Sequence, residues 1–225
     1  MMKPWQQCAL VALSMALAGV SAAGPIVDRV VTSVNGHVVL QSDWEEEVAF
    51  EALMSGRSAD SFSAAESKAA LDRLIDQELL REQVRPAQTA SSSEVTSRVA
   101  EVRKLQPEWA TEEGWHAALA RYGLTQAALE KRLSSEIQLM KLVEDRLRPS
   151  IQIDQKAVEN YYQDQLLPEI KKAGGNAKPL PEMYGKIRTL LAEKKMNELL
   201  SGWLASLRSG SRIHTPESSA GEGNR

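Results

Sequence analysis

Histidine and cysteine, the side chains that most often do chemistry in proteins, are few in this chain of 225 residues. The three histidines, His37, His116 and His214, lie far apart, and none has the His-Glu-x-x-His setting that holds zinc on a helix. The single cysteine, Cys8, excludes a disulfide within the chain and a cysteine-based zinc site. We therefore expect no metal site and no bound cofactor.

Carboxylates are abundant, but they lie where helices are expected to begin. Glu45–Glu47 and Glu112-Glu113 occupy predicted first turns, where the helix dipole favours negative charge, so we interpret them as solvated helix starts rather than acid–base pairs. The sequence has no nucleophile elbow, Walker loop or dinucleotide glycine motif, and Gly174-Gly175 alone is too short to cradle a phosphate. These patterns favour a protein that is not an enzyme.

Large apolar side chains could instead contact another polypeptide. Trp109 and Trp115 flank a predicted helix start in a polar segment, which makes them the best candidates for exposed aromatic contact, although anchoring the core is the commoner role. Met54 is an adaptable side chain of the kind found on promiscuous surfaces, with core filling as the alternative. Met54, Trp109 and Trp115 are therefore the candidate residues for binding a polypeptide.

Composition narrows the classes of partner. Lys and Arg number 27 against 30 Asp and Glu, for a net charge of −3, which argues against binding nucleic acid through bulk electrostatics. A mean hydropathy of −0.33 argues against a polytopic membrane protein. Because aromatic residues make up only 5%, aliphatic helix packing is expected to form the core.

Residues 1–23 have the pattern of a cleavable signal peptide. Lys3 precedes an apolar run from Cys8 to Val20, and small residues follow, with cleavage expected after Ala22 or Ala23. As a helix the run would span ~20 Å, short of the ~30 Å hydrocarbon core of a bilayer, which makes a transmembrane anchor the weaker interpretation. We expect Cys8 to leave with the signal and the mature chain to be soluble in the periplasm, without stable membrane insertion.

The mature chain is predicted to be mostly α-helical with one small β-hairpin. Asn35-Gly36 between β-branched residues of Ile26–Leu40 is typical of a two-residue hairpin turn. Helical periodicity then predicts helices within 44–55, 63–84, 94–105, 112–122, 125–148 and 154–166, a loop at 167–180, a last helix at 181–208 and a short strand within 211–215. The expected N-terminal caps include Ser63, Ser93, Thr111, Thr125 and Asp154. Residues 216–225 are expected to form a disordered tail.

The segment from Val27 to Asp43, with Val34-Asn35-Gly36 at its centre, resembles the start of the mature SurA family. These are periplasmic chaperones and peptidyl-prolyl isomerases that escort outer-membrane proteins. The resemblance covers roughly residues 26–215 and is also carried by 74–80, 122–125, 142–149, 158–162 and 203–208. It implies a SurA N-terminal-like chaperone domain at 24–166, completed by residues 181–215, that binds unfolded client polypeptides.

The sequence departs from that family in one respect. In SurA, parvulin isomerase domains of about 90–100 residues each, a usual domain size, separate the sixth helix from the last. Here only Gln163 to Leu180 lies between them, and the histidine strands of the parvulin pattern are missing. The resemblance therefore implies a chaperone without catalysis. Two alternatives stay open: a degenerate or related peptidyl-prolyl isomerase, and an assembly factor that docks one partner through the Trp109–Trp115 region.

The last helix carries a further expectation. Nine apolar side chains between Ile187 and Leu207 are too many for a solvated helix, so they are expected to be buried against the N-terminal helices. The predicted strand at 211–215 would then add to the hairpin and complete a single folded unit.

Overall fold

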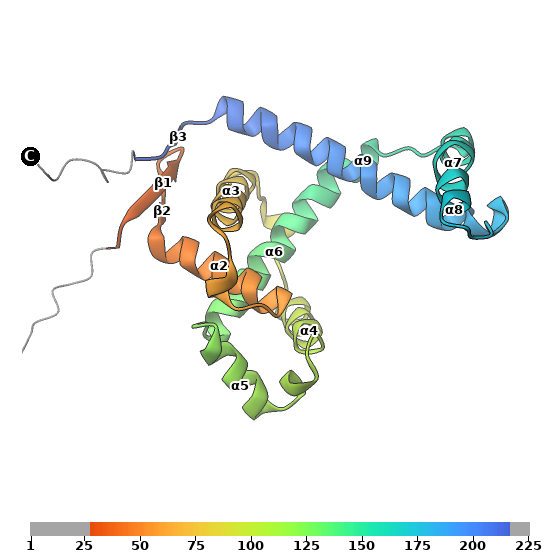
Figure 1. Cartoon of the computed structure of the whole chain (residues 1–225). Coiled ribbons are helices and arrows are strands. Elements are labelled where there is room, and N and C mark those ends of the chain that lie inside the picture. The colour runs from red at the N-terminus through yellow and green to blue at the C-terminus, as the bar shows by residue number, and fades with distance from the viewer. Residues whose placement is uncertain (1–27, 217–225) are drawn as a thin grey trace, which may run out of the picture.

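The computed structural model describes residues 28–216 of the chain. The predicted signal peptide, its two cleavage positions and residues 217–225 of the predicted tail lie outside the described residues. Within them the expected fold class is confirmed, because the chain is mostly helical with one small sheet, and its last helix packs back on the N-terminal part (Figure 1).

The sheet has three antiparallel strands in the order β2-β1-β3, formed by β1 (Val30–Val34), β2 (His37–Leu40) and β3 (Ile213–His214). The predicted turn is confirmed, since Asn35 and Gly36 have φ angles of 51° and 96°. The register of β1 and β2 shifts between Val30 and Thr32. This bulge allows two consecutive residues, Val31 and Thr32, to be buried together.

The helices follow the hairpin in chain order and are connected by short turns (Figure 1). The α-helices are α2 (Gln41–Ser55), α3 (Ala64–Arg81), α4 (Ser92–Arg103), α5 (Glu112–Arg121), α6 (Gln126–Leu147), α7 (Gln155–Tyr161), α8 (Leu167–Lys172) and α9 (Leu180–Gly210). A π-helical turn (Tyr162–Leu166) joins α7 to α8. Short 3₁₀ turns lie at Ala59–Ser61, Pro86–Gln88, Pro107–Ala110 and Arg148–Ser150.

Side-chain caps fix where most helices begin. As predicted, Ser63, Thr111, Thr125 and Asp154 each accept a hydrogen bond from a backbone N–H in the first turn. Two helices begin earlier than predicted. Helix α4 is capped by Ser91, because the Glu94 carboxylate accepts from the Ser91 N–H and closes a capping box. Helix α2 begins at Gln41, because Asp43 accepts from the Leu40 N–H.

The predicted loop at 167–180 is wrong for its first six residues. The chain stays helical from α7 through the π-turn into α8, and only residues 173–179 are outside a helix. Pro168 lies in the first turn of α8, directly after the π-helical turn, and Leu166 and Leu167 pack against neighbouring apolar side chains. Helix α8 ends two residues before Gly174, whose φ of 73° lies outside the helical range.

The buried apolar residues form three clusters. The largest lies among α2, α4, α5 and α6 and includes Leu53, Trp115 and Leu133. A second joins the sheet to α3 and the end of α9, around Val34, Ile75 and Leu79. The third joins α7 and α8 to the first half of α9, around Val158, Tyr162 and Ile187.

Helix α9 does not bury its apolar residues in the way the sequence analysis expected. Only Ile187 is fully buried, at 2% exposed, and Leu190 is exposed. The first half of α9 packs against α7, whereas the second half packs against α3 and α6. Ile187 lies in the α7 cluster and Leu207 in the sheet cluster. They are 20 residues apart, which at about 100° per residue places them about 160° apart around the axis. The two halves therefore use nearly opposite faces of one helix, and α9 spans two separately packed parts of the molecule (Figure 1).

Candidate functional site

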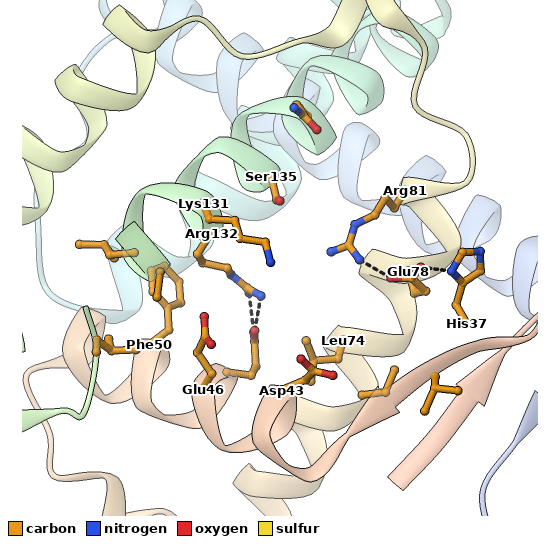
Figure 2. Close-up of a pocket in the computed structure, with 17 residues that line it drawn as sticks. His37, Asp43, Glu46, Phe50, Leu74, Glu78, Arg81, Lys131, Arg132 and Ser135 are labelled. Atoms are coloured by element: carbon orange, nitrogen blue, oxygen red, sulfur yellow. Dashed lines mark hydrogen bonds and ion pairs between the residues drawn. The ribbon is translucent and has the colours of Figure 1, made fainter. Parts of the chain in front are cut away.

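A cleft of about 550 Å³ opens between β2, α2, α3 and α6 (Figure 2). The turn at Asn35-Gly36 brings β2 back along β1, and α2 follows β2 directly, so the strand and the helix form adjoining walls. Its lining residues are His37, Val38, Val39, Asp43, Glu46, Glu47, Phe50, Leu74, Glu78, Arg81, Leu124, Ala128, Leu129, Lys131, Arg132, Ser135 and Gln138.

The floor of the cleft is apolar and belongs in part to the main core. Phe50, Leu124 and Leu129 are buried members of the largest cluster, and each also lines the cleft. Val39 from the hairpin and the half-buried Leu74 from α3 extend this surface. A side chain entering the cleft would therefore contact the same kind of surface that holds the bundle together.

A buried ion pair forms the wall between α2 and α6. Glu47 is only 3% exposed, and the Arg132 Nη2 donates to its Oε1 at 2.7 Å, while Nη1 contacts Oε2 and donates to the Gln77 side chain at 2.9 Å. The Arg132 guanidinium also lies 5.0 Å from the centre of the Phe50 ring. With these contacts made, Arg132 is a fixed part of the wall rather than a free cation.

Burial dominates the electrostatics of this pair. It raises the pKa of the Glu47 carboxyl, and the charge and hydrogen bonds of Arg132 oppose that rise. Burial also raises the pKa of Glu136, which lies 3.8 Å from the Arg132 Nε, with Arg132 and Arg98 opposing the rise. One guanidinium thus stabilises two desolvated carboxylates.

The mouth of the cleft carries charges of both signs. Lys131 from α6 and Glu46 from α2 reach toward the opening from opposite walls (Figure 2), and neither forms an ion pair with any other residue of 28–216. Glu78 is occupied by Arg81 and lies 3.6 Å from the His37 Nδ1. The free charges therefore do not select a ligand of one sign.

The cleft combines apolar side chains at its base with unpaired charges of both signs at its mouth. An apolar floor contributes affinity for many sequences, and free charges of both signs tolerate varied polar side chains at the mouth. In the part of the chain that the structure describes, no group of three or more His, Cys, Asp or Glu side chains could hold a metal ion. His37, His116 and His214 lie on β2, α5 and β3 respectively.

The residues that the sequence analysis selected for binding lie elsewhere. Trp109 and Trp115 are 5% and 1% exposed, with ring centres 6.0 Å apart, so they are wrong as candidates for exposed contact and instead anchor the core, the commoner role. Met54 is half-buried and packs against the same cluster. The polar residues around the two tryptophans do not expose them but hold their segment in place. Arg103 donates hydrogen bonds to the carbonyls of Trp109 and Ala110 at 3.0 and 3.1 Å.

Sequence reasoning missed the cleft, although one signal pointed to it. Glu47 is three residues before Phe50 and seven before Met54, which places a carboxylate on the apolar face of α2. A charged residue at such a position needs a buried partner. The partner is 85 residues away on α6, so only the packed fold identifies it.

Comparison with protein families gives one match. The model of a family described as the SurA-like N-terminal domain matches residues 5–143. All residues that line the cleft, from His37 to Gln138, fall within this range, whereas α7, α8 and α9 lie beyond it. No curated protein matches the chain. No helix within residues 28–216 is long and apolar enough to cross a membrane.

Proposed function

Because the chain belongs to the SurA-like N-terminal domain family, whose role is chaperone-related, we propose that it is a periplasmic chaperone that binds unfolded polypeptides without catalysis. We propose clients of the outer-membrane type, as the resemblance to SurA implies. The signal-peptide pattern of residues 1–23 supports export, and a mature chain without cysteine suits an oxidising compartment.

The observation that carries this proposal is the cleft between β2, α2, α3 and α6. The half-buried Leu74, with Phe50 at the base of the cleft, offers apolar surface to client side chains, and Lys131 and Glu46 leave both charges free at the mouth. An unfolded client loses conformational entropy when it binds, so affinity should be modest and tolerant of sequence. A cleft of about 550 Å³ admits a few side chains of an extended segment, not a folded domain.

Two further features argue against the two alternatives, isomerase activity and docking of one partner. Between the π-turn and α9 the chain forms only α8 and the short segment 173–179, which leaves no room for a parvulin domain at that point. The alternative of docking one partner through Trp109 and Trp115 loses its surface, because both rings are buried.

The test is suppression of aggregation of an unfolded outer-membrane β-barrel protein. Ser135 lines the cleft, so Ser135→Trp should fill it and raise the concentration needed for suppression several-fold. Ser97→Trp makes the same change at an exposed position of α4, outside the cleft, and should behave as the wild type. Equal loss in both variants, or none in either, would contradict a client site in the cleft.

The same preparation addresses catalysis. Wild-type protein should not accelerate exchange of an X-Pro peptide beyond its uncatalysed timescale of ~10–100 s at 25 °C. A rate proportional to protein concentration would instead support the isomerase alternative.

A further inference from the structure

One strand of the sheet has an edge without a neighbour, and that strand borders the cleft. In the order β2-β1-β3, β2 pairs with β1 on one side and with no other strand of residues 28–216. Three of its four residues, His37, Val38 and Val39, line the cleft. The unpaired edge and the cleft are therefore continuous.

The hydrogen bonds around β2 show which backbone groups face this edge. The Gln41 N–H donates to the Arg29 carbonyl at 2.8 Å, toward β1, whereas the Leu40 N–H donates to the Asp43 carboxylate at 2.8 Å, away from it. Backbone groups alternate in direction along a strand, so His37 and Val39 face β1 and Val38 faces outward. The two-residue turn, which pairs Val34 with His37, gives the same alternation. The N–H and C=O of Val38 thus point to the free edge.

Apart from its short length, this edge lacks the devices that usually protect one. Edge strands normally carry lysine, proline or a bulge that prevents pairing with other chains. The sequence of β2 is His-Val-Val-Leu, and the bulge lies in the central strand β1. The Val38 side chain is 52% exposed, and Val30, on the neighbouring strand, is 42% exposed. The opposite edge, β3, is only two residues long and offers little to pair with.

We propose that an extended client segment adds to β2 as a fourth strand, with alternate side chains entering the cleft. The proposal rests on the proposed function and specifies how the client is held. An extended chain is the conformation whose backbone satisfies the Val38 N–H and C=O, and its period of two directs every second side chain to one face. The class of client is therefore a strand-forming segment in which apolar and polar residues alternate, as in a β-strand with one apolar face.

The short length of β2 sets the strength of this interaction. One outward-facing residue offers one donor and one acceptor, so backbone pairing fixes the direction and register of the client, and side-chain contacts in the cleft add to the affinity. Such binding is weak and easily reversed, which suits the release of a client to its folding site.

Val38→Pro is the variant that separates edge pairing from cleft binding. Proline at position 38 removes the outward-facing N–H and no hydrogen bond to β1. Edge strands tolerate proline at positions whose N–H faces away from the sheet. Val38→Ala is the matched control, because it shortens the side chain and keeps the N–H. The probe is a short fluorescent peptide in which valine alternates with threonine, and binding is followed by anisotropy. Wild type should bind, Val38→Ala reports the loss of the side chain alone, and Val38→Pro should bind several-fold more weakly than Val38→Ala.

Two measurements separate a failure of the proposed function from a failure of strand addition. Aggregation suppression by the wild type is recorded first, and its absence would overturn the proposed function itself. If the wild type suppresses aggregation but Val38→Pro binds the peptide equally well, only strand addition is overturned.

Exchange of the Val38 amide in the wild type, followed by NMR, provides a second test that stands even if Val38→Pro does not fold. The peptide should slow this exchange, and a variant peptide with proline at each threonine should not. Unchanged exchange with the first peptide would overturn the proposal. If exchange of the Val38 amide instead slows as the protein concentration rises, without peptide, the proposal is also overturned, because a second copy of the chain would then occupy the edge.

Discussion

The ion pair between Glu47 and Arg132 is the residue-scale feature on which the cleft wall depends. From the sequence, Glu47 is one of three consecutive glutamates at a helix start, and the dipole explains all three equally well. The structure separates them, since Glu46 reaches the mouth of the cleft while Glu47 is buried against α6. The contact with Arg132 on α6 decides which of these glutamates is buried. Local sequence carries no information about which of several adjacent carboxylates meets a partner on another helix.

Arg132→Met should destabilise the protein most at neutral pH. It leaves the buried Glu47 charge without its partner, a loss that costs ~3–5 kcal/mol in comparable buried pairs. Burial already raises the pKa of Glu47, and removing Arg132 raises it further, so the folded variant takes up a proton more readily than the unfolded chain. The deficit relative to wild type is therefore largest above the raised pKa and shrinks as the pH falls toward the ordinary value of 4.5.

Denaturant unfolding followed by circular dichroism over a pH series measures this deficit. The double variant Glu47→Leu with Arg132→Met is the control, because it removes both charges and should recover much of the lost stability. A deficit that does not vary with pH would show that Glu47 does not carry the charge left behind.

At the scale of elements, local signals predicted helix starts well and helix continuation poorly. Ser63, Thr111, Thr125 and Asp154 cap helices as expected, because a cap is a contact within four residues of sequence. The segment 167–172 is predicted as part of a loop from the lysines, glycines and prolines between Lys171 and Pro181, yet it is helical and Leu166 and Leu167 pack against the Val158 cluster. Whether a weak helix forms depends on a neighbour that the local pattern does not reveal.

Glu94 at the start of α4 should make stability depend on pH in the acidic range. The hydrogen bond from Lys141 on α6, together with those from Ser91, lowers the pKa of Glu94 from 4.5 to about 2. The folded state thus favours the charged carboxylate, and its contribution is present above pH 4.5 and lost as the pH falls toward about 2. Glu94→Gln should lower the melting temperature at neutral pH and have the same melting temperature as the wild type near a pH of about 2.

Thermal unfolding of both proteins across this pH range is the measurement. Glu101→Gln, which removes a charge from the same helix without touching its cap, is the control. A difference between wild type and Glu94→Gln that persists unchanged at the lowest pH would contradict the role assigned to the cap.

At the scale of the whole molecule, α9 connects two packed parts that share no buried cluster. The sequence predicted this helix, and the strand that follows it pairs with β1 as expected. It did not reveal that the two halves of α9 pack through nearly opposite faces, because a list of apolar positions does not say which neighbour each one meets. Ile187 packs with α7, whereas Leu207 packs with α3 and the sheet.

This arrangement predicts local rather than global effects at the two ends of α9. Ile187→Ala removes the one fully buried side chain of this helix, a change that costs ~2–5 kcal/mol in well-packed cores. Hydrogen exchange should then accelerate in α7, α8 and the first half of α9, and stay as in the wild type in α4, α5 and α6, whose cluster contains no residue of α9.

Ending the chain at Gly174 should have a different and larger effect. It removes the hydrogen bonds of Arg208 to Asp76 and to the Asp72 carbonyl, at 2.6 and 2.9 Å, and leaves Val34, Ile75 and Leu79 without Leu207 and Ile213. The sheet and α3 should lose protection together with α7 and α8, and the melting temperature should fall, while the cluster around Leu53 and Trp115 stays protected. A shortened chain that melts and exchanges as the intact one would show that α9 does not hold the sheet to α3. Uniform loss of protection would instead show that the bundle cannot fold without α9.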